Sequence, residues 1–181
     1  MMTPPSARFN FLLGFLFCAV LLSAALYFQF VDGLDPCPLC ISQRIMVLAL
    51  ALVLLAAFIH NPGRKGVRLY SVAGCLVALV GASISARHVW LQHLPADEVP
   101  ACGPGLEYMF HYFPLTDTLR AMLTGTGDCA KVDWRLFGLT MPAWVLICFV
   151  FLAIFCLLQY WNASYWRKPM PPSETNQEAL R

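Results

Sequence analysis

Four long stretches of the chain consist almost entirely of apolar side chains. The first runs from Phe9 to Val31, 23 positions without a charged residue. At about 1.5 Å per residue, a helix of this length crosses a hydrocarbon layer of roughly 30 Å with some tilt. Similar stretches follow at about 41–58, 69–86 and 142–160. The pattern predicts an all-α membrane protein, a bundle of four transmembrane helices.

The composition agrees with this prediction. Of the 181 residues, 59% are hydrophobic and only 12% are charged, against about 25% charged residues in a typical soluble domain. Four spanning helices leave room for one domain, which we place at residues 1–168. The tail at 169–181 is rich in Pro, Ser, Glu and Asn, a composition typical of disordered segments. A net charge of +2 is too small to indicate nucleic-acid binding.

The order of charged residues predicts which connections share a side of the membrane. Basic residues flank the bundle before the first stretch, between the second and third, and after the fourth: Arg8, Arg64, Lys65, Arg68, Arg167 and Lys168. The other two connections hold eight of the ten acidic residues: Asp32, Asp35, Asp97, Glu98, Glu107, Asp117, Asp128 and Asp133. The longer connection also holds Arg120, Lys131 and Arg135, so the asymmetry is clear without being absolute. By the positive-inside rule both termini are cytoplasmic, and the segments at about 32–40 and 88–141 face outward.

The long outward segment contains one further helical pattern. Leu115, Leu119, Met122 and Leu123 recur at helical spacing, with charged residues between them. This pattern predicts a short amphipathic helix lying on the bilayer surface.

The eight cysteines divide by position. Cys18, Cys75, Cys148 and Cys156 lie inside the apolar stretches, where a free cysteine is an ordinary small packing residue, and we assign them no chemistry. The other four lie in the outward segments: Cys37 and Cys40 in the short one, Cys102 and Cys129 in the long one. Paired cysteines that face an oxidising compartment indicate disulfide chemistry.

Cys37 and Cys40 form a C-x-x-C motif, whose small ring favours a reversible disulfide. Cys40 falls where the second helix begins, and the unpaired amides and dipole of a helix start favour a thiolate. Arg44 follows one turn later on the same face, where its guanidinium can stabilise that thiolate. Arg44 also fits a second interpretation, an interfacial anchor whose long side chain reaches the polar surface.

Cys102 and Cys129 are 27 residues apart, and a bridge between them would contribute roughly 3 to 4 kcal/mol through loop closure. A structural staple is therefore one interpretation of this pair. The presence of a second outward pair favours another, in which disulfides are exchanged between the pairs by thiolate attack.

Several motifs together resemble the DsbB family of disulfide bond formation proteins, from the first apolar stretch to the start of the fourth. They are Cys-Pro-Leu-Cys-Ile-Ser-Gln-Arg at 37–44, His-Val-Trp-Leu-Gln-His-Leu-Pro at 88–95, Cys102, Gly-Asp-Cys at 127–129, Trp134, and Gly-Leu-Thr-Met-Pro at 138–142. The resemblance implies a quinone-dependent thiol oxidase in the bacterial inner membrane, with its outward segments in the periplasm.

The resemblance also implies a role for each outward cysteine. Cys102 and Cys129 would form the disulfide that oxidises a DsbA-like partner, with Cys102 as the site of the mixed disulfide. The electrons would then pass to Cys37 and Cys40, and Cys40 would contact ubiquinone or menaquinone.

Two further residues match family positions near the quinone. The resemblance places Arg44 against a quinone oxygen and His88 near the ring. Taken alone, His88 fits an interfacial histidine without chemistry equally well. Gln43 stands where members of the family commonly carry glutamate, so proton delivery by that acid would need another route in this chain.

Two alternatives to this function come from other classes. The four outward cysteines could form the tetrahedral shell of a structural zinc site, although we predict no metal. The chain could instead be a thiol oxidoreductase of the vitamin K epoxide reductase type, which also uses outward cysteine pairs and quinones. In that class the quinone-facing C-x-x-C belongs to the last part of the bundle, whereas here it precedes the second helix.

Overall fold

The computed structural model describes residues 5–95, 97–103, 108, 111–132 and 134–165. The expected disordered tail at 169–181 lies outside these residues, as do Glu107 and Asp133 from the acidic segments.

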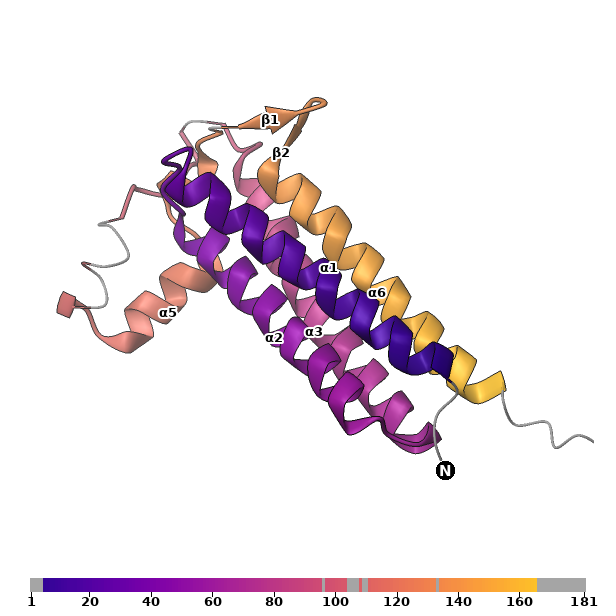
Figure 1. Ribbon diagram of the computed structural model, residues 1–181. Coiled ribbons are helices and arrows are strands. Elements are labelled where there is room, and N and C mark those ends of the chain that lie inside the picture. The colour runs from indigo at the N-terminus through magenta and orange to yellow at the C-terminus, as the bar shows by residue number, and fades with distance from the viewer. Residues whose placement is uncertain (1–4, 96, 104–107, 109–110, 133, 166–181) are drawn as a thin grey trace, which may run out of the picture.

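Four long helices lie side by side and form the body of the molecule (Figure 1). They are α1 (Pro5–Phe30), α2 (Pro38–His60), α3 (Arg64–Leu91) and α6 (Met141–Tyr165). Each is long and apolar enough to cross a membrane. The predicted four-helix, all-α membrane architecture is therefore confirmed. Both ends of the described chain lie at the same end of the bundle (Figure 1).

The helices extend beyond the predicted stretches. α2 begins at Pro38, because Cys37 is extended (φ −68°, ψ 164°) and serves as its N-cap. A proline is well tolerated there, since the first amides of a helix have no partner within the helix. α3 runs on to Leu91, past its predicted end at about residue 86. His88 consequently lies on a regular helix, as expected if the third stretch continues through Arg87, His88 and Trp90.

The helices pack around one apolar core. Its fully buried members include Phe11, Leu50, Leu54, Phe149 and Leu152. The helix positions that point away from this core are also apolar. Every long helix carries large exposed apolar side chains, among them Val20, Leu52, Leu69, Leu76 and Ile154. Such extensive exposed apolar surface is typical of helices that face lipid.

Small residues allow α3 and α6 to approach closely, and these two helices share the most extensive interface of the bundle. A Cβ added at Gly81 would lie 2.3 Å from the buried ring of Phe149. Close backbone approach at small residues is the usual way for helices to associate in lipid.

The end of the bundle farthest from the termini carries the other elements (Figure 1). They are α5 (Leu115–Thr124), a short 3₁₀ turn η1 (Gly127–Ala130), and a hairpin of β1 (Arg135–Leu136) and β2 (Leu139–Thr140). The hairpin turns through Phe137 and Gly138, both with positive φ, as in the tight turns that suit twisted strands. The sequence pattern did not predict this hairpin.

The predicted amphipathic helix is present as α5, which projects from the side of the bundle near α2 (Figure 1). Its Leu115, Leu119 and Leu123 are exposed, whereas Met122 is buried. The Ser42 hydroxyl on α2 lies 2.7 Å from the Met122 carbonyl and donates to it, which fastens the end of α5 to the bundle.

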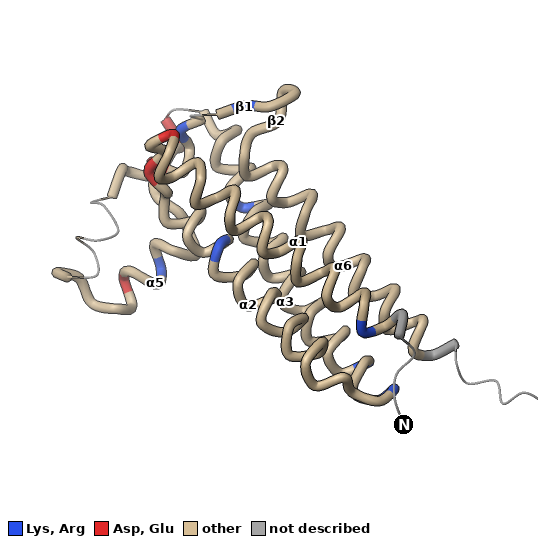
Figure 2. The backbone as a smooth tube through the Cα atoms, viewed as in Figure 1, with Lys and Arg blue, Asp and Glu red and all other residues tan. Residues whose placement is uncertain are grey.

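The sign of the charged residues differs between the two ends of the molecule. Figure 2 shows the described acidic residues at the end that carries α5 and the hairpin, while the opposite end carries basic residues. The long helices between these ends are almost free of charge, as a membrane interior requires.

Candidate functional site

The C-x-x-C motif lies at the start of α2. The backbone amide of Cys40, in the first turn of α2, donates a hydrogen bond to the Cys37 sulfur at 3.3 Å. The two sulfurs are 3.0 Å apart. Both thiols therefore lie together at the end of α2 that faces the loops.

The η1 turn brings Cys129 to this pair. The sulfurs of Cys37 and Cys129 and a ring nitrogen of His88 all lie within 4.8 Å of one another. Cys129 is fully buried and packs with Leu39, Ile84 and Leu91 beneath the site. One member of each outward pair thus meets the other, although the two segments are far apart in the sequence.

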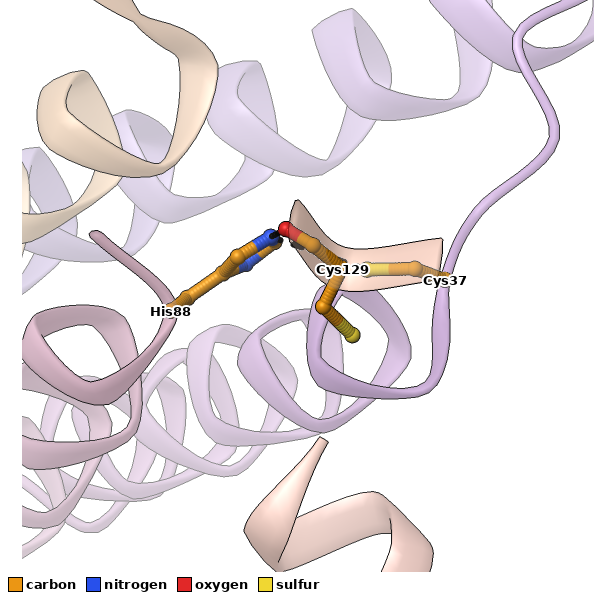
Figure 3. A group of neighbouring side chains, drawn as sticks. All are labelled: Cys37, His88 and Cys129. Atoms are coloured by element: carbon orange, nitrogen blue, oxygen red, sulfur yellow. Dashed lines mark hydrogen bonds between the residues drawn. The ribbon is translucent and has the colours of Figure 1, made fainter. Parts of the chain in front are cut away.

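His88 connects the segments through a buried hydrogen-bond chain. Its Nδ1 lies 3.3 Å from the amide nitrogen of Gln43, and its Nε2 lies 3.1 Å from the carbonyl oxygen of Cys129. With the Gln43 amide as donor to Nδ1, the ring is neutral and carries its proton on Nε2, which donates to Cys129. Figure 3 shows the ring pointing at that carbonyl. Nε2 also lies 3.7 Å from the Cys37 sulfur.

The sulfur cluster favours ionisation of Cys129. A hydrogen bond with the Cys37 thiol, followed by backbone hydrogen bonds from Leu39 and Thr126, lowers the pKa of Cys129 from 9.0 to about 6 against the opposing effect of burial. The pKa of Cys37 is raised, because its proton is shared with the sulfurs of Cys129 and Cys40 and because the site is buried. The cluster therefore favours the thiolate form of Cys129 over that of Cys37.

Cys102 lies at the surface beside η1. Its side chain is exposed, and a Cβ added at Gly127 would lie 3.1 Å from its sulfur. The Gly127 amide donates a hydrogen bond to the Ala101 carbonyl at 3.2 Å, which joins the residue before Cys102 to η1. All eight cysteines are free thiols in this structure, so the expected bond between Cys102 and Cys129 stays a prediction.

Arg44 is anchored on α1. Its guanidinium donates to the side chain of Gln29 and, at 3.0 Å, to the carbonyl of Ala25. A charged group near lipid is costly unless it is paired in this way. The same residue lines the cavity beside the C-x-x-C motif.

That cavity has a volume of about 570 Å³ and lies where α1, α2, α3 and α6 meet the loops. Cys37, Cys40, Arg44 and His88 supply polar groups to its wall, and Phe28, Trp134, Met141 and Pro142 supply apolar ones. The rings of Phe28 and Trp134 are 5.3 Å apart. Four of the six residues predicted for the site thus share one cavity, Cys129 lies directly behind it, and Cys102 stands outside it at the surface.

Similar sequences are known over most of the length of this chain. The sequence profile described as Disulfide bond formation protein DsbB matches residues 7–159. The chain belongs to the DsbB family. A disulfide bond formation protein B from Methylococcus capsulatus is 73% identical over 163 residues, which cover 90% of this chain and 99% of the relative. The corresponding protein from Nitrosococcus oceani is 53% identical, with 85% and 91% covered.

Membership in the DsbB family identifies the chain as a multi-pass membrane protein that takes part in disulfide bond formation, with disulfide oxidoreductase activity. Its other cysteines are part of the helix packing. Cys18 and Cys156 are buried in the core, and Cys75 and Cys148 are half-buried.

Sequence analysis missed the part that Gln43 plays in this DsbB site. It noted the residue only as a departure from the family pattern. A signal was available, because Gln43 lies four residues from both Leu39 and Val47 on the buried face of α2. A polar side chain on an otherwise apolar buried face needs a hydrogen-bond partner, and here the partner is His88.

Proposed function

We propose that this DsbB family member is a thiol oxidase that reoxidises a DsbA-like periplasmic dithiol protein and passes the electrons to a membrane quinone. The observation that carries the proposal is the meeting of Cys37 and Cys129 beside a cavity lined by Cys40 and Arg44.

The first exchange takes place at the surface. A thiolate of the reduced partner attacks Cys102 in the Cys102–Cys129 disulfide, forms a mixed disulfide with it and releases Cys129 as a thiolate. The partner's second thiolate then attacks the partner's first sulfur, which is bonded to Cys102 in the mixed disulfide. This step frees Cys102 as a thiolate and leaves the partner with a disulfide. The exposure of Cys102 and the low pKa of Cys129, a good leaving group, support this assignment.

The second exchange takes place in the sulfur cluster. The Cys129 thiolate attacks Cys37 in the Cys37–Cys40 disulfide, so the bond from Cys129 to Cys37 forms and Cys40 leaves as a thiolate. Cys102 then attacks Cys129, which restores the Cys102–Cys129 disulfide and leaves Cys37 and Cys40 holding the two electrons. Proximity of the attacking and attacked sulfurs supports this order.

The cavity fits the ring of a quinone such as ubiquinone or menaquinone. Its volume of about 570 Å³ lies in the range of about 300 to 1,000 Å³ that is typical of small-molecule sites. Its apolar wall suits the ring, Arg44 can donate to a ring oxygen, and the Cys40 thiol is on the wall. When bound, the quinone supplies the two-electron acceptor for the reduced C-x-x-C pair.

Removal of one cysteine separates the two halves of the relay. We expect Cys40→Ser to stop quinone reduction, followed by quinone absorbance with reduced partner, because the last dithiol of the relay is lost. The exposed Cys102 should still trap the partner as a mixed disulfide on a non-reducing gel. Quinone turnover near the wild-type rate in Cys40→Ser would refute the proposed order.

A further inference from the structure

We propose that the reduced chain binds one zinc ion between Cys37, His88 and Cys129, and that this ion prevents the coordinated sulfurs from taking part in disulfide exchange. The site is distinct from the four-cysteine zinc site considered from the sequence, because the exposed Cys102 is outside it and a histidine is part of it. It uses groups of the relay but requires neither partner nor quinone.

The ligand geometry is close to that of a zinc site before any movement. With Zn–S distances of about 2.3 Å and Zn–N distances of about 2.0 Å, ligand atoms around a tetrahedral ion are about 3.5 to 3.8 Å apart. The Cys37 sulfur and the His88 Nε2 are already 3.7 Å apart. The Cys129 sulfur lies within 4.8 Å of both groups, so shifts of about 1 Å or less close the set.

A fourth donor is present beside these three. The Cys40 sulfur lies 3.0 Å from that of Cys37 but outside the group of atoms that are within 4.8 Å of one another, so it would have to move toward His88 and Cys129 to complete a tetrahedral shell of three sulfurs and one nitrogen. Such a shell is closed, which is typical of zinc sites that hold structure rather than activate water. The cavity beside Cys37 and Cys40 gives an ion a route to the cluster.

Gln43 allows His88 to serve as a ligand. Zinc needs the lone pair of Nε2, so the ring proton must move to Nδ1, and Nδ1 must then donate instead of accepting. A glutamine can follow this change by rotating its amide, which offers the oxygen in place of the nitrogen. A metal-bound histidine usually donates its second ring nitrogen to an oxygen of this kind.

Binding is a proton exchange and not a redox step. One zinc ion replaces the thiol protons of its cysteine ligands, and the sulfurs keep their oxidation state. A coordinated sulfur is no longer free to attack a disulfide. In the oxidised chain the same sulfurs are held in disulfides, so we expect the site only in the reduced protein.

Cobalt titration of the full-length protein in detergent tests the site without partner or quinone. We expect the reduced protein to bind one Co²⁺ with the visible and near-ultraviolet bands of tetrahedral thiolate coordination, and Zn²⁺ to displace it. The oxidised protein should show no such bands. Because the same unmutated chain is compared in two redox states, a folding defect does not enter this comparison.

Variants then identify the ligands. Cys129→Ser and His88→Asn should each weaken binding by about a hundredfold or more, since loss of even an outer-shell partner costs ten- to a hundredfold. Cys102→Ser is the matched control from the same outward segment and should bind cobalt as the wild type does. In the reduced wild type, Zn²⁺ should slow maleimide labelling of Cys37 at least tenfold and leave that of Cys102 unchanged.

Three results would overturn the proposal: no stoichiometric cobalt bands in the reduced protein, bands of full strength in Cys129→Ser, or loss of binding in Cys102→Ser. The last result would point to the four-cysteine site. None of these results bears on quinone reduction, so failure of the zinc site and failure of the proposed relay are distinguishable.

Discussion

The buried side chains of Gln43 and His88 determine each other's orientation. Gln43 donates to Nδ1 of His88, which leaves the Nε2 proton for the carbonyl of Cys129. Because Cys129 approaches Cys37 in the same place, the tautomer of His88 bears on how firmly the two outward segments are joined. Gln43 acts through His88 and is a positioning residue.

Substitutions at Gln43 test this role. Gln43→Leu leaves the buried Nδ1 without its partner, and we expect the reduced protein to lose about 1 to 3 kcal/mol of stability in thermal unfolding. Gln43→Glu offers Nδ1 an acceptor, so its ionised form should recover part of that loss while shifting the ring proton to Nδ1, visible in nitrogen NMR of labelled histidine. An unchanged melting temperature in Gln43→Leu would contradict the assignment.

Arg44 combines an anchoring contact with a place on the cavity wall. We expect Arg44→Lys to raise the Michaelis constant for quinone about tenfold or more, roughly 1.4 kcal/mol, because lysine keeps the charge and loses the planar fork. Oxidation of the reduced partner by the Cys102–Cys129 disulfide should change much less, because it precedes electron transfer to the quinone. Steady-state kinetics with varied quinone measures both effects.

Gln29→Leu is the control for the anchoring contact, since it removes one α1 partner of Arg44 and leaves the guanidinium in place. Its Michaelis constant should stay within about threefold of the wild-type value. If Arg44→Lys changes neither the Michaelis constant nor the maximal rate, Arg44 is an anchor only.

At the scale of the elements, the link between α5 and η1 controls the position of Cys129. Gly125 ends α5 with φ 82° and ψ 160°, a conformation open essentially only to glycine. A Cβ there would also lie 2.6 Å from the side chain of Leu91 and 2.7 Å from that of Leu39. These two leucines belong to the same buried cluster as Cys129. Backbone freedom and space are therefore both required at this position.

We expect Gly125→Ala to destabilise the link by about 1 to 3 kcal/mol and to slow formation of a Cys37–Cys129 cross-link. The cross-link is best followed in a background that carries Cys40→Ser and Cys102→Ser, where no competing outward thiol is present. Gly138→Ala is the matched control, because Gly138 has φ 80° and nothing within 4 Å of an added Cβ. Equal cross-linking rates in the two variants would show that space at Gly125 is unimportant.

Over the whole molecule, the two ends of the bundle differ in charge: the described acidic residues all lie at one end, together with several basic ones, whereas the described charged residues at the opposite end are basic (Figure 2). Both ends of the described chain lie at the basic end, and the start of α2, which Cys37 caps, lies at the end that carries the acidic residues (Figures 1 and 2). We propose from this asymmetry that the termini are cytoplasmic and the sulfur cluster periplasmic. In that orientation, Cys37, Cys40, Cys102 and Cys129 would all face an oxidising compartment.

Reporter fusions test the orientation. A reporter fused after Arg64, at the start of α3, should behave as cytoplasmic, and one inserted near Asp97, beyond the end of α3, as periplasmic. The physical reason is the cost of moving the cluster of Arg64, Lys65 and Arg68 across the membrane. Both reporters on one side would be incompatible with a spanning α3.

Features that depend on local pattern could be predicted from the sequence. Long apolar stretches fixed the four helices, because a membrane span has a set length. Helical spacing of leucines identified α5, and the position of each cysteine relative to the stretches separated outward pairs from packing residues. Family motifs identified the residues on which the proposed relay rests.

Which of these residues come into contact depends on how distant segments pack, and it could not be predicted from the sequence. The approach of Cys129 to Cys37, the chain from Gln43 through His88 to the Cys129 carbonyl, and the docking of Arg44 on α1 all join distant segments. No periodicity encodes such contacts, because they depend on how η1 and the extended end of α3 pack over the start of α2. The hairpin escaped prediction for a related reason: its strands have two residues each, too few to show an alternating pattern.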